Sequence, residues 1–211
     1  MERNVDKFKN SLLSVDRIKA ENLLHEFAVD SPLVDHIDKL IVPALEEIGR
    51  GWESGEISLS QVYMSSRICE DFLEDFLPAV HSDNNKQPDA AIVTLEDSHI
   101  LGKRIVTSML RSAGFNLLDY GYGIDAERLV DRVIKEEIKI LLISVLMLRS
   151  AIQVEEVVGK LKTQGSRVQV AVGGAPFLLD TQLWKEVGAD TMGKNASEAI
   201  SIVKSLKGDL S

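Results

Sequence analysis

The sequence predicts an α/β protein in two parts: an N-terminal four-helix bundle over residues 1–82, and a doubly wound, Rossmann-like parallel sheet over residues 89–211. Apolar residues recur at helical spacing throughout the first part. In the second part, short continuous apolar runs alternate with helical patterns, which is typical of buried parallel strands joined by helices. A polar segment, residues 83–88, ends in proline between the two parts and indicates an interdomain linker.

The helices of the first part are predicted to pack as an antiparallel bundle, because their connections are short. Ser31 and Pro32 predict the start of the third helix, since serine caps helix N-termini and proline fits the first helical turn. Pro43 lies inside that helix and is expected to kink it. Ser58 and Gln61 have the spacing of a capping box and predict the start of the last helix.

The second part is predicted to contain buried strands separated by helices. Gly114, Gly165 and Gly188 stand where helices are expected to end. The segment 121–123, Gly-Tyr-Gly, is expected to be a turn that is too short to bind phosphate. The expected strands, in chain order, are residues 90–95, 115–120, 138–146, 168–172 and a brief 191–192, and the last helix is expected over residues 196–206.

Composition argues against several classes of function. The net charge of −9 disfavours nucleic-acid binding through a basic surface. No apolar run reaches the length of about 18 residues that spans a membrane, and the N-terminus lacks the apolar region of a secretory signal, so a cytoplasmic protein without a membrane partner is expected. Cys69 is the only cysteine, which excludes intrachain disulfides and predicts a buried thiol.

Ligand-binding residues are expected directly after the strands, because open parallel sheets bind ligands at the carboxyl ends of their strands. Residues 96–103 follow the first strand and contain Asp97-x-His99-x-x-Gly102. Residues 144–146 follow the third strand and read Ser-Val-Leu. The first segment matches the D-x-H-x-x-G signature of the corrinoid-binding domains of cobalamin-dependent methyltransferases and mutases, and the second resembles the S-x-L motif of the same family.

Two further stretches resemble that family. Gly173 and Gly174, after the fourth strand, resemble its glycine pair, and residues 52–56 resemble the W-x-x-G-E stretch of its helical cap domain. The resemblance covers nearly the whole chain. It is strongest to the small two-domain corrinoid proteins that carry methyl groups between separate methyltransferase subunits.

The resemblance implies a cobalamin or related corrinoid as cofactor. In the family, the histidine displaces the cofactor's dimethylbenzimidazole base and becomes the lower axial cobalt ligand, which is called base-off/His-on binding. His99 takes that place here, and imidazole is a suitable ligand for cobalt. Asp97 is expected to accept a hydrogen bond from the other ring nitrogen, which would fix the tautomer and raise the basicity of the ligand.

The displaced nucleotide tail is buried in the sheet of family members. Gly102 is expected to leave space for the tail, and Ser144 to donate a hydrogen bond to its base. Gly173 and Gly174 are expected to allow close backbone approach. Cobalamin-dependent methionine synthase has a threonine four residues after this serine, whereas this chain has Leu148, so one polar contact to the tail is expected to be lost. The remaining residues of the expected cofactor-binding set are Ser98, Ile100, Leu146 and Ala196.

The helical part is expected to cover the upper face of the corrinoid. An apolar lid would exclude water from reactive cobalt, and its candidates are Trp52, Val62 and Ser66. Trp52 could equally be a core or interface aromatic. The linker over residues 83–88 is expected to act as the hinge that lets the lid move aside for methyl transfer.

The function implied is a corrinoid protein that cycles between Co(I) and methyl-Co(III) while it carries a methyl group between methyltransferases. Its expected partners are a substrate-specific methyltransferase and an acceptor methyltransferase; a reductive activase and a second copy of the chain are further candidates. The chain is not expected to catalyse methyl transfer alone. Alternatives are a cobalamin-binding sensor that signals through its oligomeric state or a partner, the small subunit of an adenosylcobalamin mutase, and a corrinoid-free module in which Asp97 merely caps a helix that His99 begins.

Overall fold

The computed structural model describes residues 2–28, 37–76 and 88–209, and the chain divides into two compact units, Met1–Ala79 and Val80–Ser211. Each unit is described by itself. The expected helix start at Ser31 and Pro32 and the expected linker over residues 83–88, except Pro88, lie outside the described residues.

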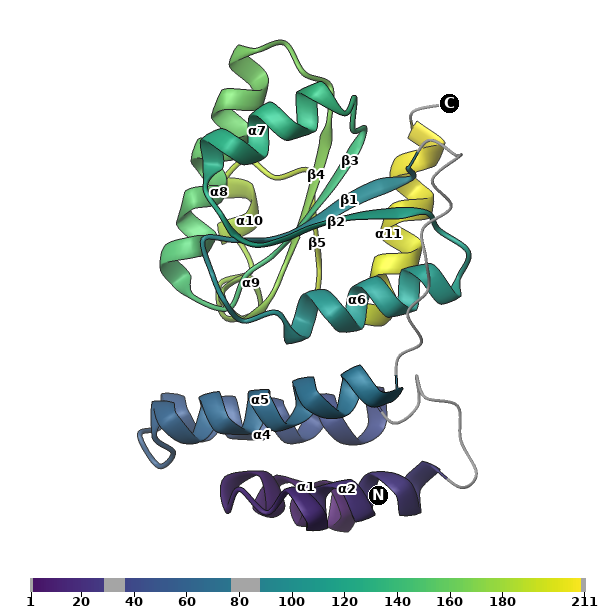
Figure 1. Ribbon diagram of the computed structural model, residues 1–211. Helices are drawn as coiled ribbons and strands as arrows, with labels where there is room; N and C mark the ends of the chain where they lie inside the picture. The colour runs from purple at the N-terminus through teal and green to yellow at the C-terminus, as the bar shows by residue number, and fades with distance from the viewer. Residues whose placement is uncertain (1, 29–36, 77–87, 210–211) are drawn as a thin grey trace. The chain divides into compact units, whose positions relative to one another are not determined.

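The first unit is helical, as the apolar spacing predicts (Figure 1). Its described elements are α1 (Glu2–Leu13), α2 (Arg17–Ala28), η1 (Ile37–Ile41), α4 (Val42–Glu53) and α5 (Leu59–Phe76). The kink expected at Pro43 takes the form of a junction, in which the π-helical turn η1 passes into α4. Pro43 lies in the first turn of α4, where a backbone N–H is not needed for the helical ladder.

The capping box at the start of α5 forms as predicted. The backbone N–H of Gln61 donates to Ser58 Oγ at 3.3 Å, and Gln61 Oε1 accepts from the backbone N–H of Ser58 at 3.0 Å. Cys69, on the same helix, is fully buried as expected, and burial raises the pKa of its thiol. This cysteine therefore packs as a small apolar residue.

The second unit has the doubly wound α/β fold that the sequence predicts. Its five strands are all parallel and lie in the order β2-β1-β3-β4-β5. The strands are β1 (Ala90–Leu95), β2 (Leu117–Ile124), β3 (Ile140–Ser144), β4 (Gln169–Gly173) and β5 (Thr191–Gly193). The helices are α6 (Leu101–Ser112), α7 (Ala126–Lys135), α8 (Leu148–Thr163), α9 (Ala175–Leu179), α10 (Leu183–Glu186) and α11 (Ala196–Asp209).

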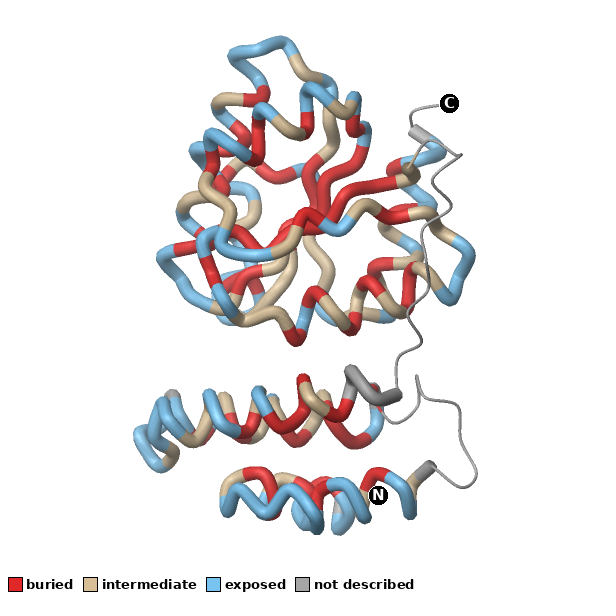
Figure 2. The backbone as a smooth tube through the Cα atoms, viewed as in Figure 1, coloured by how far each residue is buried: buried red, intermediate tan, exposed pale blue. Residues whose placement is uncertain are grey.

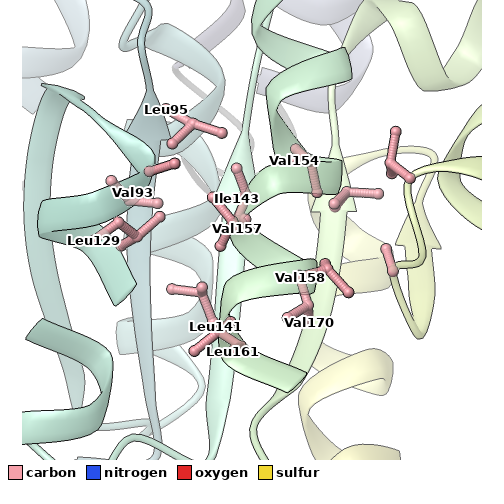
Figure 3. Close-up of a cluster of buried hydrophobic side chains, with 14 of the residues drawn as sticks. Val93, Leu95, Leu129, Leu141, Ile143, Val154, Val157, Val158, Leu161 and Val170 are labelled. Atoms are coloured by element: carbon pink, nitrogen blue, oxygen red, sulfur yellow. The ribbon is translucent and has the colours of Figure 1, made fainter. Parts of the chain in front are cut away.

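Helices cover both faces of this sheet (Figure 1). Alternate residues of each strand point to opposite faces, and the interior strand β1 is buried on both sides (Figure 2). One face packs against α7 and α8 through a large aliphatic cluster, part of which Figure 3 shows, including Val93, Leu141 and Val157. The other face, with Ile92 and Leu142, packs against α6 and α11.

Two features of this unit differ from the prediction. Strand β2 continues through Gly121-Tyr122-Gly123 instead of turning there, because both glycines take a positive φ (79° and 68°) and the pairing with β1 is irregular at this point. The short helices α9 and α10 were not predicted, since helices of five and four residues are too short to show a period. Gly114, Gly165 and Gly188 end helices with positive φ, as expected.

Candidate functional site

The predicted site residues lie where the order of strands in the sheet reverses. β1 and β3 are neighbours, and the chain connects them to β2 on one side and β4 on the other. In open α/β sheets such a switch point is where ligands bind, beyond the carboxyl ends of the two strands. The loop 96–100 follows β1, and residues 145–147 follow β3. Both predicted motifs therefore meet at this edge.

Asp97 joins these two segments. The residue is only 6% exposed, and its Oδ2 accepts hydrogen bonds from the backbone N–H groups of Leu146 at 3.0 Å and Met147 at 3.1 Å. Its Oδ1 accepts from the backbone N–H of His99 at 3.0 Å and lies 2.5 Å from Nδ1 of the His99 ring. One carboxylate thus holds the loop after β1, the loop after β3 and the imidazole together.

The surroundings of Asp97 favour its ionised form. Burial by itself would raise the pKa of this carboxyl, but hydrogen bonds from the His99 ring and from the backbone N–H groups of Leu146, His99 and Met147 outweigh burial and lower the pKa below its ordinary value of 3.8. A buried carboxylate with two positioned oxygens is a rigid anchor for an imidazole.

Asp97 contacts the His99 ring at Nδ1, which makes Nε2 the candidate metal-ligating nitrogen. Its side chain is 24% exposed, in a loop that immediately precedes α6. The alternative in which Asp97 is a helix cap does not hold, because Ile100 occupies the N-cap position of α6 and no side chain caps it. Asp97 instead serves the neighbouring loop and the histidine.

Gly102 and Ser144 lie against each other across the interface between α6 and the sheet. A Cβ atom on Gly102 would stand 3.3 Å from Ser144 Oγ, which is tighter than an ordinary contact. Thr94, paired in register with Ser144, is fully buried, and its Oγ1 has no hydrogen-bond partner among the described residues. Gly102 lets α6 approach the sheet closely, and the buried Thr94 hydroxyl lacks a partner among the described residues. Both features are consistent with a bound group that brings polar atoms to this face of the sheet.

Gly173 and Gly174 have different physical reasons to be glycine. Gly174 has φ 123°, and a Cβ atom there would lie 1.7 Å from the backbone oxygen of Val145. A Cβ on Gly173 would lie 3.4 Å from the backbone oxygen of Gly193, an ordinary contact. The close approach expected at the glycine pair is therefore explained at Gly174 by the protein's own backbone, and no ligand is needed to account for it.

The remaining predicted contacts lie at different distances from the switch point along the sheet edge. Ser98 is exposed and Ile100 half-buried in the loop of His99, and Leu146 is half-buried beside Asp97. Ala196 begins α11, after β5, which is three strands away from β1. The structure thus gathers the residues after β1 and β3, while Ala196 stands apart from them.

The lid candidates belong to the helical unit. Trp52 lies near the end of α4 and is 43% exposed. Val62 and Ser66 are four residues apart on α5, so they share one helical face, and both are half-buried. An exposed tryptophan is available for a contact, and the lid role of these three residues stays a prediction.

Sequence reasoning missed two hydroxyl groups. Ser150, on α8, is buried and donates to the backbone oxygen of Glu96 at 3.2 Å, which ties the helix to the loop of Asp97. Thr94 was taken as one more residue of the apolar run Ala90–Leu95. It is the one polar side chain in that run, which was a signal that this position is unusual.

These features define a class of protein: a doubly wound α/β domain that holds a carboxylate-anchored histidine at its switch point, with a helical unit before it. No helix in the described ranges is long and apolar enough to cross a membrane. Comparisons with known proteins narrow this class.

Residues 89–201 match the model of a B12 binding domain, and residues 5–74 match a second model, also described as a B12 binding domain. Monomethylamine corrinoid protein 2 and the trimethylamine corrinoid protein of Methanosarcina barkeri are each 31% identical to the chain, over 93% and 96% of its length and 94% and 96% of theirs. A corrinoid protein of Desulfitobacterium hafniense is 30% identical over 97% of both chains.

The fold agrees with these matches. The structure of the Methanosarcina barkeri monomethylamine corrinoid protein superposes with a TM-score of 0.81 at 27% identity, covering 98% of this chain and 99% of the other. The chain therefore belongs to the family of B12-binding corrinoid proteins, and its cofactor is a corrinoid.

Proposed function

We propose that this protein is a methyl carrier, which holds a corrinoid in the base-off/His-on form and presents it in turn to two methyltransferases. The observation that carries the proposal is the Asp97–His99 pair at the β1/β3 switch point, because it supplies one oriented imidazole where the cofactor of a B12 binding domain would need it. When bound, the corrinoid supplies a cobalt centre that can accept and release a methyl group.

The residues of the chain divide the work of holding this group. His99 Nε2 would ligate the cobalt, while Asp97 orients the ring through Nδ1 and holds the loop after β3 in place through its other oxygen. Gly102 keeps α6 clear of Ser144, whose hydroxyl is proposed to bond the nucleotide tail. Trp52, Val62 and Ser66 are proposed to shield the upper face and exclude water.

The partners follow from the same proposal. A substrate-specific methyltransferase would load the carrier and an acceptor methyltransferase would unload it, with a reductive activase to restore inactive cofactor. The relatives whose names contain monomethylamine and trimethylamine make methylated amines the first donors to test. A cytoplasmic location and a homodimer belong to the proposal as well.

A carrier must keep its cofactor through a complete methylation cycle. We would load the protein with hydroxocobalamin, remove excess cofactor, reduce with titanium(III) citrate, add methyl iodide, and repeat gel filtration after each step. The carrier role predicts that corrinoid and protein elute together throughout and that the spectrum changes to that of a methylated corrinoid. Loss of the cofactor on methylation, or failure to methylate, would contradict the role.

A sensor would behave differently in a second measurement. A regulatory protein is expected to change its oligomeric state when its bound cofactor changes. Multi-angle light scattering is carried out on the cofactor-free, hydroxocobalamin-loaded and methylcobalamin-loaded protein. A carrier should have the same oligomeric state in all three forms. A change of mass that depends on the form of the cofactor would favour the sensor instead.

A further inference from the structure

Thr94 is fully buried, and its hydroxyl group has no hydrogen-bond partner among the described residues. A buried hydroxyl without a partner is destabilising, because it has lost its hydrogen bonds to water and gained none in return. Valine has nearly the same shape and would avoid this loss, so the hydroxyl at this position calls for a role.

The position of Thr94 suggests what that role is. It pairs in register with Ser144 of β3, and registered residues of parallel strands point to the same face of the sheet. Ser144 faces α6, because its Oγ would lie 3.3 Å from a Cβ on Gly102. Ile92, two residues before Thr94 and therefore on the same face, packs in the cluster on the α6 and α11 side. Thr94 and Ser144 thus present neighbouring hydroxyls to the same interface.

The row that contains these two hydroxyls continues across the sheet with the smallest residues. Ser144 pairs with Gly173, and Gly173 pairs with Gly193. From β1 to β5 the row reads Thr, Ser, Gly, Gly, at the carboxyl ends of four strands. Further from the carboxyl edge, the same face carries larger apolar residues such as Ile92 and Leu142. The two hydroxyls therefore stand at the end of this face that approaches the switch point.

Leu148 offers no hydroxyl to the proposed tail. It lies four residues after Ser144, where the sequence comparison predicts the loss of one polar contact to the tail, and it is 59% exposed at the start of α8. Helix α8 packs on the face of the sheet opposite to α6. No hydroxyl at position 148 assists Ser144, whereas Thr94 is its neighbour in the sheet.

We propose that Thr94 is a second hydroxyl that hydrogen-bonds the nucleotide tail of the bound corrinoid, beside Ser144 and under Gly102. The inference rests on the proposed corrinoid site and assigns part of its affinity to one residue. A threonine hydroxyl both donates and accepts, so it can bond the base nitrogen or the ribose hydroxyls of the tail. The tail would then supply the hydrogen-bond partner that Thr94 Oγ1 lacks among the described residues.

The test compares a corrinoid that has the tail with one that lacks it. Dissociation constants of hydroxocobalamin and of aquacobinamide are measured by spectral titration for the full-length wild type, Thr94→Val and Thr94→Ser. Thr107→Val is the matched control, because it removes a buried hydroxyl from α6 that is already bonded to the Lys103 backbone oxygen at 2.7 Å. Thr94→Ala is added as a smaller variant in case valine disturbs packing, and thermal unfolding of each apo protein is recorded.

The expected result is selective. Thr94→Val should raise the dissociation constant of hydroxocobalamin about 3- to 10-fold, which corresponds to the loss of one neutral hydrogen bond. The dissociation constant of aquacobinamide should not change. Thr94→Ser should bind like the wild type, and the apo Thr94→Val protein should unfold at the same or a higher temperature, because it no longer buries an unsatisfied hydroxyl. Thr107→Val should leave the ratio of the two dissociation constants unchanged.

Two outcomes would overturn the inference at different levels. In the first, Thr94→Val and Thr94→Ala each weaken the binding of hydroxocobalamin and aquacobinamide by the same factor, or change neither. Either result would show that Thr94 does not contact the tail, while the corrinoid site itself would stand. A wild-type protein that binds neither corrinoid would refute the proposed function, and the assignment of Thr94 would be rejected with it.

Discussion

Asp97 and His99 show what single residues contributed to the prediction. The spacing of the motif was enough to predict that the carboxylate reaches the imidazole, because two residues in an extended loop bring the groups together. The second use of Asp97, as acceptor for the backbone N–H groups of Leu146 and Met147, could not be predicted. It depends on the packing of β1 against β3, which joins segments almost fifty residues apart in the chain.

This double role predicts the effect of Asp97→Asn. An amide keeps one acceptor oxygen, and if that oxygen bonds Leu146 and Met147, its NH2 group faces His99 Nδ1. The ring must then carry its proton on Nε2, the nitrogen proposed to ligate cobalt. We expect corrinoid to remain bound through its tail with weaker histidine ligation, and the Co(II)/Co(I) midpoint potential to become less negative, because a weaker axial donor stabilises Co(II) less.

Spectroelectrochemical titration measures that potential. Asp125→Asn is the matched control, because Asp125 also accepts a backbone N–H, from Arg128 at 2.8 Å, but caps α7 instead of bonding the imidazole. An unchanged potential in Asp97→Asn would remove the tuning role of the carboxylate. A shift in the Asp125→Asn protein would show that the measurement does not report on the site.

The glycine pair gives a second prediction at this scale. Gly174→Ala would place Cβ 1.7 Å from the Val145 backbone oxygen at a φ of 123°, so the loop after β3 must move. We expect a loss of about 2–4 kcal/mol in the free energy of unfolding, measured by urea denaturation. Gly173→Ala meets only an ordinary 3.4 Å contact and should cost less than about 1 kcal/mol. Equal losses in the two variants would contradict this explanation.

Strand β2 shows where local patterns mislead at the scale of elements. Gly121 and Gly123 are typical turn residues, yet the chain uses their positive φ to bend an irregular strand. Buried Lys103, on α6, supports this bend, because its Nζ lies 2.5 Å from Asp119 Oδ1 and 3.2 Å from the Gly121 backbone oxygen. The long elements were predictable because burial repeats along them, whereas this contact between α6 and β2 exists only after folding.

Packing of α6 on the sheet predicts the effect of Gly102→Val. Gly102 is exposed and stands beside Ser144, so a branched side chain would occupy the space proposed for the tail. We expect hydroxocobalamin to bind at least about 10-fold more weakly, a difference of about 1.4 kcal/mol, with little change in apo stability. Isothermal titration and thermal unfolding provide the two measurements.

Gly159→Val is a control for valine in a helix, because no atom lies within 4 Å of a Cβ at that position of α8. It should change stability little, because valine is a slightly better helix former than glycine, and it should keep its affinity for hydroxocobalamin. If Gly102→Val binds hydroxocobalamin as tightly as the wild type, the tail does not pass this glycine.

The two-part organisation is a prediction at the scale of the whole molecule, with expected domains over residues 1–82 and 89–211. The compact units divide between Ala79 and Val80, and the two B12 binding domain matches cover residues 5–74 and 89–201. The expected linker over residues 83–88 remains a prediction. So does the lid, because Trp52 and His99 belong to different units.

Identity of the methyl donor and acceptor was beyond prediction for a physical reason. A carrier contributes the ligand and the pocket of its cofactor, while the partner methyltransferases select the substrates. The paired residues on the sheet edge, Thr94, Ser144, Gly173 and Gly193, are proposed to determine how the corrinoid is held. They carry no information about which compound supplies the methyl group.

The most direct test of this account is the ultraviolet–visible spectrum of the protein after loading with hydroxocobalamin and methylcobalamin and removal of free cofactor. The account predicts that the wild type retains corrinoid with a base-off, histidine-ligated spectrum. The His99→Ala variant should lose tight binding and this spectrum, whereas His25→Ala, on α2 of the helical unit, should match the wild type. Failure of the wild type to retain corrinoid, or an unchanged spectrum in His99→Ala, would contradict the central claim.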